Sequence, residues 1–183
     1  VWGIDYSTSQ GGDPSQVARS SGVLCRVLGG GWSAVQQYDR PAVLNLRFPG
    51  GQEGDVLLIG LAPERARINL GDRTIDVRPD VLQSHWDGEF LLLWKPPITG
   101  DLFIGRQASQ GANAWLRETL ARASPESLEL ADPTQADWPL RAAVTHFQQT
   151  QGLAADGIAG PDTIIRLNSL SERPNIPRIR MPN

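Results

Sequence analysis

The run Phe147–Thr163, FQQTQGLAADGIAGPDT, constrains the fold of this 183-residue chain more than any other segment. Apolar residues recur at helical spacing from Leu140 to Phe147 and predict an amphipathic helix. Gly152 stands where a left-handed C-terminal cap is needed, so this helix ends there. Gly160-Pro161 puts proline in the first turn of a second helix, predicted over residues 161–170. The segment therefore predicts two helices joined by a tight connector.

The spacing of this run also carries a family resemblance. FQ, GL, DG and GPxT stand at the offsets that they have in the small three-helix peptidoglycan-binding module. A helix predicted over residues 112–120 is similar to the first helix of that module, although the loop 124–136 lacks the DGxxG turn often seen there. The resemblance implies a three-helix bundle over residues 110–170. It also implies peptidoglycan as the ligand.

The connector has the chemistry that such a ligand requires. Asp156, Gly157 and Thr163 place backbone N–H groups and two polar side chains near a helix N-terminus, which suits the carboxylates and amides of a stem peptide. The residues predicted to bind peptidoglycan are Gln148, Asp156, Gly157, Gly160 and Thr163. The apolar residues of the module are assigned to its core, because a domain this small needs its apolar side chains buried. They are Phe147, Leu153, Ile158 and Leu167.

The first half of the chain predicts a small β-sheet. Short β-type runs bounded by Gly, Pro and Asp cover residues 41–48, 55–61, 67–70, 74–77 and 89–94. Helices are expected over residues 15–24, 32–38 and 79–86. The predicted fold class is α+β, and the predicted domains are a sheet domain at 1–97, a linker at 98–109, the module at 110–170 and an extended tail at 171–183. Repeated prolines in the tail exclude a regular element, so we expect it to lie along the surface or to fray.

The order of the elements in the first domain resembles the C-terminal half of papain-like cysteine peptidases of the bacteriocin-processing type. The histidine position of that family matches Asp55, and its aspartate position falls near Asn69 or Leu70. No N-terminal helix headed by cysteine is present, so the resemblance implies a peptidase-like fold without its catalytic machinery.

An enzyme remains an alternative at this stage. Cys25, His85 and Asp87 supply the residue types of a thiol peptidase or a wall-lytic enzyme, in which histidine activates the thiolate. Cys25 lies in the apolar run Val23-Leu24-Cys25, where a cysteine usually behaves as a small hydrophobe. A third possibility is an interaction scaffold whose wall-binding motif has lost its ligand.

A peptidase-like domain followed by a peptidoglycan-binding module resembles the periplasmic region of the general secretion pathway protein A family of type II secretion. The stretches that carry the likeness are 31–32, 40–44, 86–97 and the connector motif. The resemblance implies a non-catalytic periplasmic segment that helps to assemble or place the outer-membrane secretin through the cell wall. It also implies the B component and secretin subunits as partners, homo-oligomers on the wall, an ATPase domain elsewhere and an inner-membrane anchor in the full-length protein.

Composition excludes several other functions. A net charge of −3 with a single lysine, Lys95, gives no basic patch for nucleic acid. The two histidines, His85 and His146, show no metal-ligand spacing, and no phosphate-binding loop is present, so we expect neither metal nor cofactor. No apolar run approaches the roughly 20 residues of a membrane span. Trp2, Trp32 and Trp138 are the candidates for exposed stacking.

Overall fold

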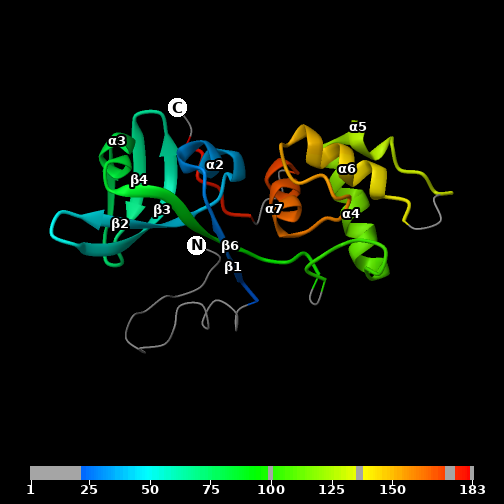
Figure 1. The fold of residues 1–183 in the computed structure, drawn as a ribbon, viewed down its shortest axis with the longest axis horizontal. Coiled ribbons are helices and arrows are strands. Elements are labelled where there is room, and N and C mark those ends of the chain that lie inside the picture. The colour runs from blue at the N-terminus through cyan, green and yellow to red at the C-terminus, as the bar shows by residue number, and fades with distance from the viewer. Residues whose placement is uncertain (1–21, 99–100, 135–137, 172–175, 182–183) are drawn as a thin grey trace. The chain divides into compact units, whose positions relative to one another are not determined.

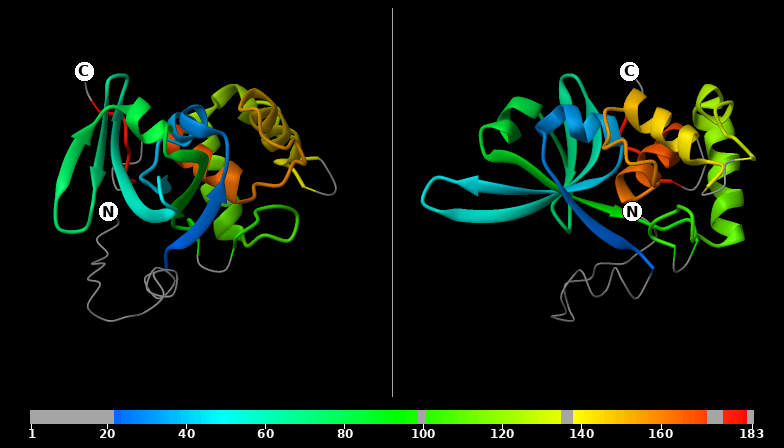
Figure 2. Two further views of the ribbon diagram at one scale, coloured as in Figure 1. Left: turned by 60° about the vertical axis from the view of Figure 1, so that its left-hand side comes forward. Right: turned by 45° about the vertical axis from the view of Figure 1, so that its right-hand side comes forward.

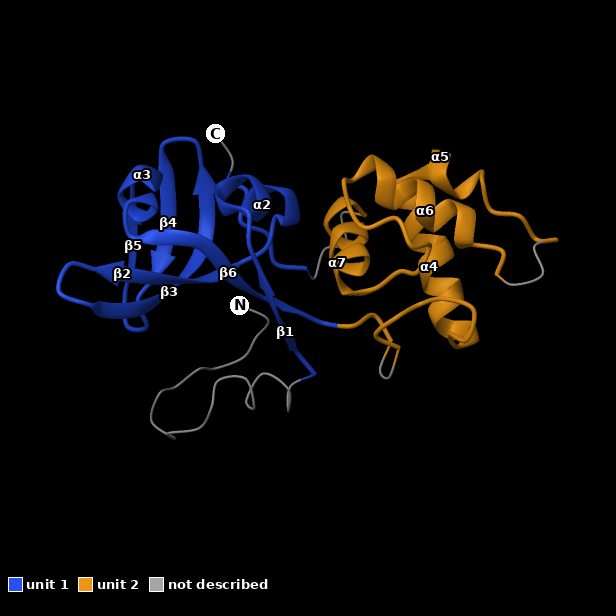
Figure 3. Ribbon diagram, viewed as in Figure 1, with its two compact units in different colours: residues 1–95, 175–183 blue, residues 96–174 orange. Residues whose placement is uncertain are grey.

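The computed structural model describes residues 22–98, 101–134, 138–171 and 176–181 (Figure 1). The chain forms two compact units, shown in Figure 3. The sheet unit comprises residues 1–95 and 175–183, and the helical unit comprises residues 96–174. Trp2 and most of the helix expected over residues 15–24 lie outside the described residues.

A six-stranded antiparallel sheet forms the sheet unit, with the strand order β1-β6-β2-β3-β4-β5. The five β-type runs of the sequence all become strands. The sixth, β1, falls where a helix was predicted to end at Leu24, and that prediction was wrong. Leu24 pairs with Trp94 on β6, because an open sheet edge overrides a weak local pattern. The strands are β1 (Leu24–Leu28), β2 (Ala42–Phe48), β3 (Gln52–Ala62), β4 (Arg65–Asn69), β5 (Thr74–Val77) and β6 (Trp86–Trp94).

Alternation along the strands directs one face of the sheet to a core. On β2, Leu44 and Leu46 are buried while Asn45 and Arg47 are exposed. Two helices contribute to the same core, α2 (Gly31–Tyr38) through Val35 and α3 (Pro79–Gln83) through Leu82. The helix α3 is shorter than the predicted 79–86 because β6 already begins at residue 86. The hairpin of β2 and β3 projects beyond the shorter strands β4 and β5 (Figure 2).

Four helices form the helical unit: α4 (Gln110–Ala123), α5 (Pro125–Leu128), α6 (Arg141–Thr150) and α7 (Pro161–Leu170). Ser109 caps α4 by accepting a hydrogen bond from the Ala112 amide. The end of α6 agrees with the sequence prediction, since Gly152 has φ 67° and the Leu153 amide donates to the Gln148 carbonyl at 2.8 Å. The short helix α5 was not expected. Among the described residues, no helix has the length and apolar character needed to cross a membrane.

Two segments differ from their expected roles. Residues 98–109 were predicted as a linker, yet Ile104 is fully buried and exchanges two backbone hydrogen bonds with Ala159 at 3.0 and 2.9 Å. The tail was expected to lie along the surface or to fray, yet Ile179 is buried and its carbonyl accepts from the Leu61 amide. The helical unit is therefore an insertion between two parts of the sheet unit.

Candidate peptidoglycan-binding site

The connector between α6 and α7, residues 154–160, is held in shape by one buried amide. Gln148 is 1% exposed. Its Nε2 donates to Asp156 Oδ1 at 2.9 Å, to the Ile158 carbonyl at 2.9 Å and to Thr163 Oγ1 at 3.1 Å. Its Oε1 accepts from the Gly157 amide at 2.9 Å. Gln148 thus holds the connector in place through hydrogen bonds, and its side chain is buried.

Gly157 is the position in the connector that only glycine fits. Its φ is 74°, in the left-handed region that L side chains rarely adopt. A Cβ atom here would lie 2.8 Å from Cγ of Arg141 and 2.9 Å from Oγ1 of Thr145, both on α6. The glycine therefore allows the connector to pass close to the helix.

Asp156 is the exposed polar residue of the predicted site. Its Oδ1 accepts from Gln148 and, at 2.9 Å, from the Ile158 amide. No hydrogen bond to its Oδ2 is found in the described part of the chain, and the residue is exposed. Gly160 precedes α7 and lies beneath the ring of Phe103, since a Cβ there would be 3.2 Å from Phe103 Cε1.

The structure brings all five predicted residues together, but it gives them different surroundings. Gln148, Gly157 and Thr163 are buried, and their polar groups hydrogen-bond within the connector. Asp156 is exposed and Gly160 is half-buried. Asp156 and the edge of Gly160 are therefore the accessible members of the predicted site.

An apolar surface lies next to these residues. Ile158, assigned from sequence to the core, is 44% exposed, and that assignment was wrong. The antiparallel bridge between Ile104 and Ala159 explains this, because the residues that flank a buried pair point to the opposite side. Phe103 flanks Ile104 in the same way and is 63% exposed. We define the connector surface as Phe103, Asp156, Ile158 and Gly160.

Phe103 was missed in the sequence because residues 98–109 read as a linker. The apolar triplet Leu102-Phe103-Ile104 was the available signal, since a free linker rarely carries three large apolar residues in a row. The other core assignments behave differently. Phe147 and Leu167 are fully buried, as predicted, and Leu153 is half-buried.

The tryptophans do not form a stacking platform in the described residues. Trp138 is buried, and its Nε1 donates to Asn113 Oδ1 at 2.8 Å. Trp32 is half-buried, with its ring centroid 4.8 Å from that of Trp86.

The thiol-peptidase constellation is not assembled. Cys25 lies opposite Leu93 near the end of β6, whereas His85 immediately precedes the start of that strand. Eight residues of strand separate the two positions by roughly 26 Å. Nδ1 of His85 lies 3.1 Å from the Arg47 carbonyl, and Asp87 pairs with Arg47 at 3.3 Å.

The positions matched by the peptidase resemblance do lie near one another. Asn69 on β4 pairs with Leu57 on β3, and Asp55 lies two residues before Leu57 on the same face. Both side chains accept hydrogen bonds from other residues of the sheet unit. Asp55 Oδ1 accepts from Asn45 at 2.9 Å, and Asn69 Oδ1 accepts from the Gly71 amide at 2.9 Å. The described residues contain no group of three or more His, Cys, Asp or Glu side chains that could hold a metal ion.

Comparison with known proteins identifies the class of the helical unit. Residues 112–167 match the family model described as "Putative peptidoglycan binding domain". The helical unit is therefore a module of the peptidoglycan-binding class.

The whole chain is similar to one family of secretion proteins. It is 30% identical over 174 residues to "General secretion pathway protein A" of Aeromonas hydrophila. This alignment covers 95% of the chain and 31% of that protein. It is 25% identical over 169 residues to "Putative general secretion pathway protein A" of Escherichia coli (strain K12), covering 91% of the chain and 33% of that protein. The chain belongs to the general secretion pathway protein A family and spans about a third of the length of these relatives.

Solved structures extend the likeness to the fold. A periplasmic domain of the EpsAB fusion protein of the Vibrio vulnificus type II secretion system matches with a TM-score of 0.53 and 25% identity. The match covers 87% of this chain and 79% of that one. The peptidase C39 like domain of the toxin secretion ATP-binding protein from Vibrio parahaemolyticus aligns with 51% of this chain and 78% of that one, at a TM-score of 0.38 and 19% identity.

Proposed function

We propose that this chain is the periplasmic, peptidoglycan-binding segment of a type II secretion assembly factor. In this role it helps to assemble or place the outer-membrane secretin through the cell wall, and it does so without catalysis. The observation that carries the proposal is the connector surface, an exposed patch built on a rigid, hydrogen-bonded connector within a module of the wall-binding class.

The chemistry of the connector surface favours a stem peptide over a bare glycan. Phe103 offers an exposed apolar ring, against which a peptide side chain or the C–H face of a sugar packs. Asp156 is exposed and offers its carboxylate as a hydrogen-bond acceptor. This acid favours amide N–H and ammonium groups of a stem peptide and disfavours its carboxylates, whereas the sequence suggested a site for both the carboxylates and the amides.

Pelleting with purified sacculi tests this assignment. The Phe103→Ala variant removes the ring, and we expect roughly fivefold weaker binding, because an aromatic contact contributes on the order of 1 kcal/mol. Asp156→Asn keeps an acceptor at Oδ1 for the connector but removes the charge, so it too should weaken pelleting. Leu130→Ala is the matched control, since Leu130 is an exposed apolar residue, 46% exposed, outside the connector surface. Equal pelleting of Phe103→Ala and Leu130→Ala would remove the site from the connector surface.

The absence of catalysis is a separate part of the proposal. Its support is the distance between Cys25 and His85, which separates the thiol from the histidine that would act as its base. Labelling with a thiol-reactive probe at neutral pH should proceed at the rate of an ordinary cysteine. Peptide cleavage that disappears in Cys25→Ser would instead restore the enzyme as the function.

The assembly role rests on the family and on the fused A and B components of the Vibrio vulnificus relative. A weak wall-binding module gains strength when several copies act together, because linked copies bind with a raised effective concentration. We therefore expect self-association on peptidoglycan, with the B component and secretin subunits as partners. Analytical ultracentrifugation with and without soluble wall fragments measures this, and a strict monomer in both conditions would contradict it.

A further inference from the structure

The tail, residues 176–181, lies beside the end of β3 as an added strand. The strand β2 pairs with β3 only as far as the Ala42–Leu58 pair, so the end of β3 has an open side. The tail fills it: the Leu61 amide donates to the Ile179 carbonyl at 2.6 Å, and the Met181 amide donates to the Leu61 carbonyl at 3.3 Å. The pairing is parallel. This is the geometry in which sheet edges bind extended peptides.

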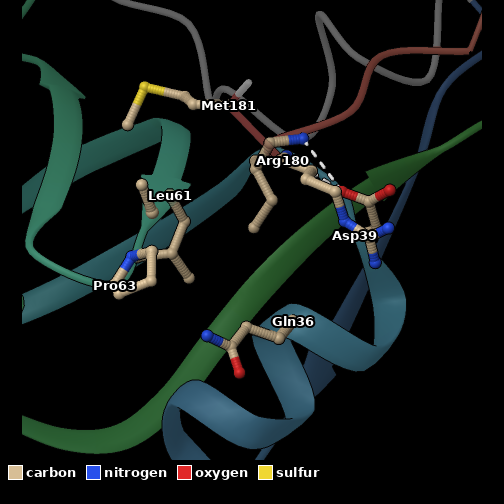
Figure 4. Close-up of a pocket in the computed structure, with 8 residues that line it drawn as sticks. Gln36, Asp39, Leu61, Pro63, Arg180 and Met181 are labelled. Carbon is tan, nitrogen blue, oxygen red and sulfur yellow. Dashed lines mark hydrogen bonds between the residues drawn. The ribbon is translucent and has the colours of Figure 1, made fainter. Parts of the chain in front are cut away.

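A buried carboxylate recognises the backbone of the tail. Asp39 ends α2 in the left-handed conformation and is 5% exposed. Its Oδ1 accepts from the Ile179 amide at 3.3 Å and from the Arg180 amide at 3.0 Å, an interaction shown in Figure 4. Its Oδ2 lies 3.4 Å from a guanidinium nitrogen of Arg178. The two amide contacts are available to any residue type except proline, whereas the contact with Arg178 selects a basic residue.

A buried guanidinium holds the other end of the tail. Nη1 of Arg40 donates to the Pro177 carbonyl at 3.1 Å. Burial and the nearby charge of Arg178 lower the pKa of Arg40 to about 10, although Asp39 opposes this. Keeping two charged groups out of water costs folding free energy, and apolar residues of similar size would anchor a permanent strand at lower cost. These two buried charged groups therefore suit a segment that is recognised by its sequence rather than a permanent strand.

The seat has more room than the tail fills. Ile179 is 2% exposed, and next to it lies a cavity of about 490 Å³ (Figure 4). Gly60 makes space for Met181, since a Cβ on Gly60 would lie 2.8 Å from the methionine sulfur. We define the tail seat as Asp39 and Arg40 with the remaining cavity residues of the sheet unit, Gln36, Leu61, Ala62 and Pro63.

We propose that the tail seat is a peptide-binding site for an extended segment of a partner protein, and that the chain's own tail is its resident occupant. The segment has a basic residue followed by an aliphatic one, like Arg178-Ile179, because Asp39 pairs with the first and the buried pocket takes the second. A partner that carries such a segment displaces the tail by strand exchange. The site is independent of the peptidoglycan-binding module.

A labelled peptide of residues 176–181, IPRIRM, tests the proposal by fluorescence anisotropy against the full chain. The tail of the wild-type chain competes from within the molecule at high effective concentration, so binding should be weak. In the Ile179→Asp chain the resident tail is expelled, and we expect at least tenfold tighter binding of the peptide. Adding Asp39→Ala to that chain should abolish the gain, whereas adding Asp72→Ala, at an exposed carboxylate of the same unit, should not.

Three results would overturn the proposal. The first is equal affinity of the peptide for the wild-type and Ile179→Asp chains. The second is equal binding of a peptide that carries aspartate at the isoleucine position. The third is a wild-type dimer in sedimentation that Ile179→Asp dissociates, since this would give the seat to the tail of a second copy.

A second arrangement covers the case in which Ile179→Asp prevents folding. A protease recognition sequence placed between Ser171 and Ile176 lets the chain fold intact before it is cut. The released tail peptide should then dissociate on dilution and rebind when added back. A cut tail that cannot be exchanged for added peptide, or that fails to rebind, would show a purely structural strand.

Discussion

Replacing Gln148 by methionine tests whether one buried amide holds the connector in shape. Methionine has a similar length and fills similar space, so the change removes the polar groups with little change of volume. The Gly157 amide and the Thr163 hydroxyl, both buried, lose their partner in this variant. The Asp156 carboxylate is exposed and recovers a bond to water.

The expected loss follows from these two buried groups. A buried donor or acceptor left without a partner costs about 1–3 kcal/mol. We therefore expect Gln148→Met to lower the free energy of unfolding of the helical unit by about 2–4 kcal/mol. This is a large fraction of the roughly 5–15 kcal/mol that stabilises a typical domain.

Urea unfolding followed by far-UV circular dichroism measures the loss by linear extrapolation. Gln149→Met is the matched control, because Gln149 is the same residue type at the next position of α6 but is exposed. The control should stay within about 0.5 kcal/mol of the wild type. If Gln148→Met unfolds at the same urea concentration as Gln149→Met, the amide does not organise the connector.

Two further predictions concern the helical unit. Gly157→Ala should lower the thermal unfolding midpoint strongly, because the position combines a φ of 74° with contacts of 2.8 and 2.9 Å to a Cβ, whereas Gly111→Ala on α4, with its nearest contact at 3.9 Å, should be neutral or stabilising. The Ser124 hydroxyl donates to Glu126 and holds the pKa of that carboxyl below its ordinary 4.5. The folded state thus favours the ionised form, and this stabilisation is present above pH 4.5 and lost as the pH falls through the lowered pKa. Glu126→Gln should therefore destabilise the unit near pH 7, and this effect should shrink as the pH falls below 4.5; an effect that does not change with pH would contradict the prediction.

Elements with local signals were predictable from the sequence. The helix α7 has the predicted bounds, residues 161–170, because proline in its first turn and its apolar stripe are both local features. The glycine ending of α6 is local in the same way. β1 was not predictable, since its pairing partner, β6, lies more than sixty residues later in the chain.

The candidate site was predictable in its location but not in its exposed face. The motif identified the connector, and the structure brings all five predicted residues together at the connector and at the helices that flank it. It could not show that Gln148 and Thr163 point inward, because that depends on the hydrogen bonds they exchange. Phe103 and Ile158 became exposed through the bridge between Ile104 and Ala159, a contact across more than fifty residues that no local pattern encodes.

The insertion of the helical unit between two parts of the sheet unit sets an order of events during synthesis. Leu61 is translated roughly 120 residues before its strand partner Ile179, a delay of about 6–24 s at ordinary rates of translation. The helical unit, residues 96–174, is a compact unit that can complete its fold in this interval. The sheet unit is thus completed only after the helical unit has been translated, and the end of β3 remains an unpaired edge until residues 176–181 are made.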